Sequence, residues 1–263
     1  MVRAKPHSSR SLRALTAAAI GVTLAACNRT QVVQGACAKV NGADVCTWGE
    51  MKGKTVTSFG ATVPMTAMKN APADMPMAWP PKADATIAFP AEVTNATGYT
   101  VLTVYWEPHG HPPGPFEVPH WDFHFYSVPA ADIAAMSCAD TTKPAELPAA
   151  YMLPDITIPG VGNLVGVCVP GMGMHSLPRS DEALTGPFEK TMVVGYYAKK
   201  PVFVEPMLAN ATLLAAHDFT LNIPAVPGEG ANVHSPASFR ADYDSAAAAY
   251  RFVFTDLGGA GAK

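Results

Sequence analysis

Residues 104–126, VYWEPHGHPPGPFEVPHWDFHFY, decide the fold and hold four of the eight histidines of the chain. β-forming residues lie on both sides of the Pro- and Gly-rich turn at 112–115, so the stretch predicts two strands joined by a stiff connection. Successive side chains of a strand point to opposite faces. In the second strand this alternation separates an aromatic face from a polar one. The aromatic face consists of Trp121, Phe123 and Phe125, and the polar face of His120, Asp122, His124 and Tyr126.

The composition favours a mainly β protein. Only 15% of the 263 residues are charged, whereas Gly and Pro number 21 and 25, which is typical of short strands joined by many turns. We predict an antiparallel sandwich or barrel with long Pro/Gly-rich loops and at most short helices. The expected elements are hairpins within 36–63, strands at 86–89, 100–106, 190–197 and 202–208 (the last two joined by a turn at 199–201), a short helix at 130–136, a long surface loop at 143–163, and a final hairpin of 239–243 with 250–254.

The first 26 residues are predicted to be an export signal. They carry four basic residues and no acid, followed by an apolar run at 14–26 that is too short to span a membrane. The run ends in Leu24-Ala25-Ala26-Cys27, which resembles a bacterial lipobox, so Cys27 is the expected lipid attachment point. An ordinary secretory signal with an incidental cysteine is the alternative.

This organisation predicts residues 1–26 as the signal, 27–36 as the lipidated cysteine and a tether, and 37–263 as a single β-rich domain. The partner would be a membrane, reached through the lipid, and the location the cell envelope. Asn28 after the cysteine indicates the outer membrane if the cell is Gram-negative.

Four cysteines remain after Cys27: Cys37, Cys46, Cys138 and Cys168. An even number in an exported chain predicts two disulfides, with three connectivities open. Pairing of sequence neighbours is the simplest of them. The chain has no C-x-x-C spacing that would indicate a thiolate metal site.

Net charge argues against nucleic acid as a partner. Without the first 26 residues the chain has 18 − 4 = 14 basic and 21 acidic side chains, a net charge of −7, and no basic cluster follows.

The polar face predicts a metal or small-ligand site, because imidazole and carboxylate suit Zn, Fe, Mn or Cu. Residues four apart in a strand lie about 13 Å apart, so His120 and His124 share one ion only if the strand bulges; neighbours two apart, at about 6.6 Å, can share one. We predict that His111, His120, His124 and His175 nevertheless converge on one site with Glu205 near it. Second-shell roles are predicted for Asp122, Tyr126 and His109. The alternative is a buried polar network that fixes strand register.

The pieces WEPHGHPPGPFEVPHWDFHFY, VPGMGMH and VFVEPM resemble an uncharacterised family of exported prokaryotic proteins that includes a Thermus protein, labelled a domain of unknown function. The octapeptide PHWDFHFY is the specific part. The resemblance implies a β-rich fold and allows a homo-oligomer, and it names no reaction. The cysteine pairs and His109 depart from the family pattern.

A weaker likeness is to the cupin metal motif, carried by His109, His111 and Glu117, although the spacing to the glutamate is too long. The sequence is therefore compatible with three functions. The first is a lipid-anchored envelope protein that binds a divalent metal or small ligand. The second is a cupin-like metalloenzyme, hydrolytic or oxidative, and the third a structural module.

Overall fold

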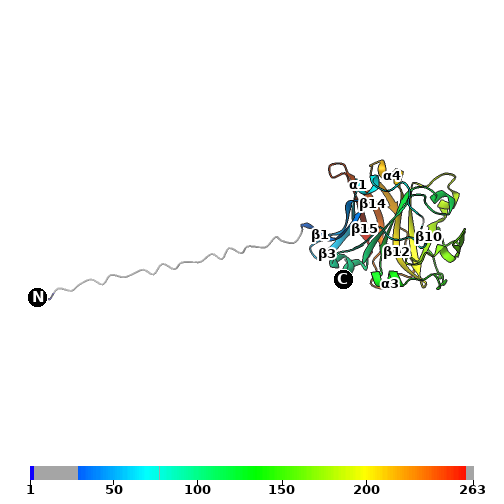
Figure 1. The fold of residues 1–263 in the computed structure, drawn as a ribbon. Helices are drawn as coiled ribbons and strands as arrows, with labels where there is room; N and C mark the ends of the chain where they lie inside the picture. Colours follow the sequence, from blue (N-terminus) through cyan, green and yellow to red (C-terminus); the bar gives the residue numbers. More distant parts are fainter. Residues whose placement is uncertain (3–28, 77, 259–263) are drawn as a thin grey trace.

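The structure is a computed structural model that describes residues 1–2, 29–76 and 78–258 (Figure 1). The predicted export signal and Cys27 lie outside these residues. Within them, no helix has the length and apolar character that a membrane crossing requires.

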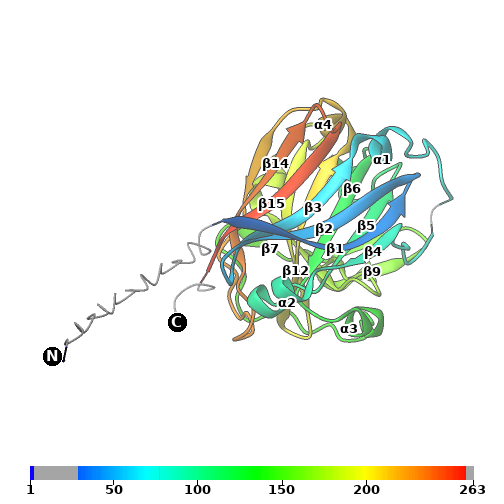
Figure 2. The ribbon, with the colours of Figure 1, turned by 90° about the vertical axis from the view of Figure 1, so that its left-hand side faces the viewer.

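Two antiparallel sheets form a sandwich (Figures 1 and 2). The first sheet has the order β1 (Thr30–Val40), β2 (Ala43–Lys52), β3 (Thr55–Pro64), β15 (Ala249–Leu257), β14 (Pro236–Asp244), β13 (Phe219–Asn222). The second has the order β4 (Ala85–Ala88), β5 (Val101–Glu107), β6 (His120–Tyr126), β12 (Lys200–Ala209), β11 (Lys190–Tyr197), β10 (Met174–Pro178), β7 (Tyr151–Met152). A separate hairpin pairs β8 (Ile156–Ile158) with β9 (Gly162–Leu164). No sheet among the described residues closes, so the sandwich is confirmed and the barrel alternative is wrong.

Helices are short, as predicted. They are α1 (Met65–Lys69), α2 (Ala91–Thr97), α3 (Ala130–Ala135), α4 (Asn210–Leu214) and the 3-10 turns η1 (Gly114–Phe116), η2 (Val165–Val167) and η3 (Arg179–Ala183). In Figure 1, α1 and α4 lie at one end of the sandwich and α3 at the other.

Tight turns set the order of the first sheet. Asn41 and Gly42 have φ of 47° and 86°, and Gly53 has φ of 64°. Positive φ at a two-residue turn matches the twist of a hairpin and favours Asn and Gly, so β1, β2 and β3 follow one another as predicted. The final hairpin, β14 with β15, is also confirmed.

Several element boundaries differ from the predictions, three of them at segments that were expected to be a tether, a turn or a loop. Residues 30–36, expected in a tether, form the first part of β1, because the long strand β2 offers them backbone partners as far as Lys52. The turn before β12 lies at Ala198 and Lys199, whose φ angles are positive, so β12 begins at Lys200, two residues before the predicted start. The loop predicted at 143–163 contains β7, β8 and the start of β9.

The core between the sheets confirms the predicted aromatic face of β6. Trp121, Phe123 and Phe125 are fully buried there. The Phe123 ring lies 4.9 Å from that of Phe252, and the Phe125 ring lies 4.5 Å from that of Phe254, both on β15 of the opposite sheet. Edge-to-face pairs at these distances stabilise beyond simple area burial. The alternation therefore fixes which face of β6 is left for the histidines.

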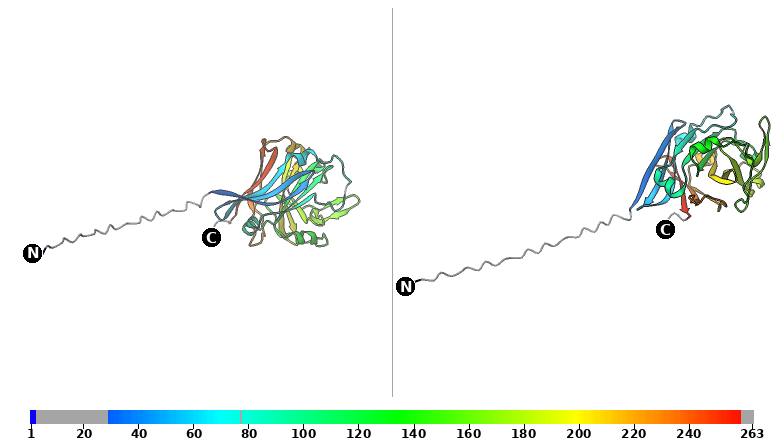
Figure 3. Two further views of the ribbon diagram at one scale, coloured as in Figure 1. Left: turned by 60° about the vertical axis from the view of Figure 1, so that its left-hand side comes forward. Right: turned by 90° about the horizontal axis from the view of Figure 1, so that it is seen from below.

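The other face of the seven-stranded sheet is covered as well. A second apolar cluster includes Phe116, Ile133, Met136 and Phe188 from the connecting segments, packed against side chains of β5, β6, β11 and β12. Figures 1 and 3 show these green and yellow-green connections on the side away from the blue strands. The polar face of β6 is consequently enclosed between a sheet and its own loops.

Each disulfide joins two cysteines that follow one another in the order of cysteines along the chain, which confirms the simplest predicted pairing. Cys37 bonds to Cys46, and Cys138 bonds to Cys168. The first bridges the paired strands β1 and β2, where the two residues are register partners. The second closes the irregular connection between α3 and β10.

Removing the second disulfide should cost more stability than removing the first. The bridged residues are 30 positions apart in one case and 9 in the other. Loop-closure entropy then gives about 3.6 kcal/mol for Cys138–Cys168 and about 2.6 kcal/mol for Cys37–Cys46. Denaturant unfolding of the Cys138→Ser/Cys168→Ser and Cys37→Ser/Cys46→Ser double variants, each the control for the other, measures the difference. The reverse order would contradict the expectation.

Candidate metal centre

Strand β6 places His120, Asp122 and His124 on one buried face of the seven-stranded sheet. Its neighbour β5 sets Glu107 opposite His120 and Tyr105 opposite Asp122. On the other side, β12 pairs Val204 with Phe125 and Met207 with Asp122, a register that puts Glu205 opposite His124. Strand pairing alone thus brings imidazoles and carboxylates from distant parts of the chain together.

Six side chains form two sets of three, and in each set the three ligand atoms lie within 4.8 Å of one another. In each triad two members are buried and one histidine, His175 or His111, is partly exposed. We call His124, His175 and Glu205 the buried triad, and we call His111, His120 and Asp122 the half-exposed triad after the 37% exposure of the His111 side chain. Each triad offers two imidazoles and one carboxylate. This donor set suits Zn and non-haem Fe(II) sites.

The buried triad has the spacing of a coordination shell. His124 Nε2 lies 3.3 Å from Glu205 Oε2 and 3.4 Å from His175 Nε2. Ligand atoms about 2.0–2.1 Å from a tetrahedral metal ion are separated by about 3.3–3.4 Å. The side chains of His124 and Glu205 are only 1% and 2% exposed, so water does not solvate them freely.

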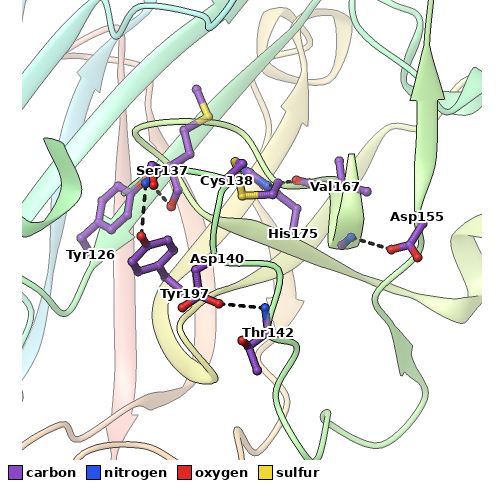
Figure 4. Close-up of a disulfide and its surroundings, with 12 residues drawn as sticks. Tyr126, Ser137, Cys138, Asp140, Thr142, Asp155, Val167, His175 and Tyr197 are labelled. Atoms are coloured by element: carbon purple, nitrogen blue, oxygen red, sulfur yellow. Dashed lines mark hydrogen bonds between the residues drawn. A yellow bond between two sulfur atoms is a disulfide. The ribbon is translucent and has the colours of Figure 1, made fainter. Parts of the chain in front are cut away.

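A backbone carbonyl orients His175. Its Nδ1 lies 2.9 Å from the carbonyl oxygen of Val167, so Nδ1–H donates and the lone pair of Nε2 points into the triad. Figure 4 shows this contact beside the Cys138–Cys168 disulfide, which holds the residue that follows Val167. Such a fixed tautomer is what a ligating imidazole needs.

Gly195 leaves room for the aromatic cover of the buried triad. A side chain there would meet the Phe203 ring at 1.9 Å, so only glycine lets the ring lie flat across β11. The Phe203 ring is 4.6 Å from the ring of His124 and 5.2 Å from that of His175. The packing fixes both imidazoles in place.

Polar atoms at the buried triad lack partners. His124 Nδ1 and Glu205 Oε2 are buried and make no hydrogen bond. Whichever nitrogen of His124 carries the proton, Nδ1 stays unpaired. A buried polar atom without a partner costs about 1–3 kcal/mol. A completed hydrogen-bond network would not leave these atoms unpaired, which argues against a purely structural role.

Burial makes the buried triad electrically neutral without a metal. Burial, with His175 beside it, lowers the pKa of His124 to about 3, and burial lowers the pKa of His175 to about 4. Burial and then the charge of Asp122 raise the pKa of Glu205 well above its ordinary value. At neutral pH both imidazoles therefore keep a free lone pair for a cation.

The half-exposed triad begins in the connection from β5 to β6. Gly110 has φ of 65°, and a side chain there would meet the Phe116 carbonyl at 2.0 Å, so glycine allows the chain to fold back tightly. His111 then lies beside the start of β6, with its ring 4.8 Å from that of His120 and its Nε2 3.8 Å from Asp122 Oδ2. His120 Nε2 lies 3.3 Å from Asp122 Oδ1.

Charge is present at this triad even without a metal. Burial opposes the charged form of His111, but Asp122 outweighs it and raises the pKa of His111 to about 9. Burial likewise opposes ionisation of Asp122, and His120 and His111 together hold the pKa of Asp122 well below its ordinary range. An imidazolium–carboxylate pair is the metal-free state at neutral pH.

The single predicted site is wrong in its geometry, because the structure divides its members between two triads. His120 and His124 lie four residues apart on a regular part of β6, too far for one ion. His175 does lie beside β6, next to His124. Asp122, expected as a second-shell partner, is in ligand position.

Two other expectations differ. His109 binds Asp74 at the surface, with Nε2 2.8 Å from Oδ1, and does not reach either triad. Tyr126 stacks on His124 with ring centroids 5.7 Å apart, but its hydroxyl donates to the carbonyl of Met172. Because Glu117 is exposed and His109 points elsewhere, the cupin-like motif does not assemble a site.

Glu107 is a neighbour that the sequence reasoning missed. It lies opposite His120, and burial and then Asp122 raise its pKa to about 7. The signal was present in the alternation of 101–107, which puts Thr103, Tyr105 and Glu107 on the same face as His120.

Comparison of the chain with protein-family models, with curated proteins and with solved structures gives no match. The chemistry of the site therefore rests on the geometry of the two triads.

Proposed function

We propose that the protein binds a divalent transition-metal ion at the buried triad and belongs to the cell envelope. The observation that supports a metal ion here is the convergence of three ligand atoms. His124 Nε2 lies 3.3 Å from Glu205 Oε2 and 3.4 Å from His175 Nε2, and His124 Nδ1 and Glu205 Oε2 are buried without a partner. An ion there would accept both Nε2 lone pairs and displace the proton of Glu205. Zn, Fe, Mn and Cu remain the candidates that imidazole and carboxylate donors support.

Elemental analysis of protein purified without chelator tests the proposal, followed by titration of stripped protein with Zn²⁺ and Co²⁺. We expect metal bound at one equivalent or more per chain, and loss of the equivalent at the buried triad in His175→Ala. The exposed His217→Ala variant is the control and should bind as the wild type does. Stripped protein that takes up none of Zn²⁺, Co²⁺, Mn²⁺, Fe²⁺ or Cu²⁺ would overturn the proposal.

Envelope location is supported by the lipobox-like Leu24-Ala25-Ala26-Cys27 and by the two disulfides, which are typical of oxidising compartments. Lipid on Cys27 would anchor the domain through a very short connection, since β1 already begins at Thr30. In a Gram-negative cell the proposed membrane is the outer one.

Cys27→Ser should release the protein from the membrane fraction or leave it unprocessed, because a lipid chain contributes about 0.8 kcal/mol of membrane affinity per buried CH₂. Fractionation with labelled fatty acid measures this, and Cys37→Ser/Cys46→Ser, which alters cysteines within the domain, is the control. Wild-type protein without label and an unchanged membrane share in the variant would contradict lipid anchoring.

A further inference from the structure

We infer that the half-exposed triad is a second metal site, separate from the buried one, with a coordination position that is open to small anions from solution. This inference goes beyond the proposed function, which needs only the buried triad. The metal would be a divalent transition ion, and the external ligand an anion of the azide or carboxylate class.

The ligand atoms of this triad are oriented from behind. His111 Nδ1 lies 3.0 Å from the carbonyl oxygen of Pro112, and His120 Nδ1 lies 2.8 Å from that of Val118. Both Nδ1 atoms therefore donate to backbone, and both Nε2 atoms face Asp122, where a metal ion would displace the Nε2 proton of His111. The backbone carbonyls of one loop thus hold both imidazoles in the tautomer and orientation that a metal ligand needs.

The atoms at the centre of the triad are buried and unpaired. His120 Nε2 and Asp122 Oδ1 are 3.3 Å apart but make no hydrogen bond. His120 is fully buried, and the side chain of Asp122 is 8% exposed. Two acceptor atoms held this close are stabilised by a cation between them.

Spacing separates the two sites. His120 and His124, one from each triad, are four residues apart on β6, about 13 Å along the strand. Metal ions that share bridging ligands lie about 3.5–4 Å apart. The two triads thus form two mononuclear centres, each with its own carboxylate.

Solvent access differs between the two. The His111 side chain is 37% exposed. His175, the one partly exposed member of the buried triad, lies with His124 against the Phe203 ring, at 5.2 and 4.6 Å between ring centroids, and the other two members of that triad are buried. Three protein ligands leave a fourth position of a tetrahedral ion for water or a substrate, as in catalytic zinc sites. One carboxylate leaves a bound divalent ion with net positive charge, so an anion replaces that water readily.

Cobalt titration of the full chain with azide as the probe tests the inference. Wild type should bind two Co²⁺ per chain, Glu205→Gln one and Asp122→Asn one. Azide should change the visible cobalt spectrum of Glu205→Gln, in which only the half-exposed triad remains, and leave that of Asp122→Asn unchanged. His111→Ala changes a partly exposed side chain and should also lose the azide response. It replaces Asp122→Asn in the test if that variant fails to fold.

The outcomes distinguish this inference from the proposed function. A Glu205→Gln variant without cobalt, or with cobalt that azide does not affect, overturns the open site. An Asp122→Asn variant that is folded but binds no cobalt overturns the buried site instead. A single equivalent in wild type that both variants lose would show one shared centre and overturn the two-site inference.

Discussion

Replacing Glu205 with Gln should abolish metal binding at the buried triad and leave the metal-free protein as stable as the wild type or more so. Glu205 is buried, its Oε2 has no partner, and burial raises its pKa well above the ordinary value. The metal-free acid is therefore neutral at neutral pH, and Gln keeps both its volume and its neutral charge. The metal-free variant should consequently lose no charge interaction.

The loss of metal affinity at the buried triad should be large. Without its carboxylate the triad keeps two neutral imidazoles, and we expect affinity at this site to fall more than about 100-fold, beyond the 10- to 100-fold typical of second-shell changes. Wild type at a metal concentration of 100 Kd gains about 2.7 kcal/mol of stability from binding. That gain should vanish in the variant.

Denaturant unfolding with and without Zn²⁺ measures both effects. Glu117→Gln is the matched control, because Glu117 is exposed and belongs only to the cupin-like motif. It should bind metal and unfold as the wild type does. If Glu205 is instead part of a satisfied hydrogen-bond network, Glu205→Gln should lose about 1–3 kcal/mol in the metal-free state, and that result would contradict the metal role.

Trp121→Ala should destabilise the sandwich by about 3–5 kcal/mol, the usual cost of removing a fully buried large aromatic side chain. Trp121 is 0% exposed, its ring lies 4.8 Å from that of Trp106, and its Nε1 donates to Asn210 Oδ1 at 3.0 Å. The variant therefore leaves a cavity beside β6 and an amide oxygen without its donor.

The midpoint of urea unfolding measures the loss, with Leu184→Ala as the control. Leu184 is 40% exposed, so its truncation should change stability by no more than about 0.5 kcal/mol. A Trp121→Ala variant within about 1 kcal/mol of the wild type would show that this face of β6 does not pack against the opposite sheet.

Local chemistry determined much of the fold. Alternation in PHWDFHFY separated the aromatic core face from the polar face, and Asn41-Gly42 with Lys52-Gly53 set the first hairpins through positive φ. These patterns act within a few residues, so a single sequence reveals them. The four cysteines after Cys27 likewise predicted two disulfides, but the structure decided which of the three connectivities forms.

The division of the site into two triads depended on tertiary structure. The row on β6 showed that imidazoles and a carboxylate share a face, but not which of them meet. Strand register decided that, since β12 brought Glu205 opposite His124 and β10 brought His175 to the same end of the row. The connection at Gly110 folded His111 onto Asp122 and away from His109, which remained at the surface. Register and loop closure depend on packing between distant segments, such as those of His124 and Glu205, which are 205 − 124 = 81 residues apart. The residues themselves carry no local mark of that packing.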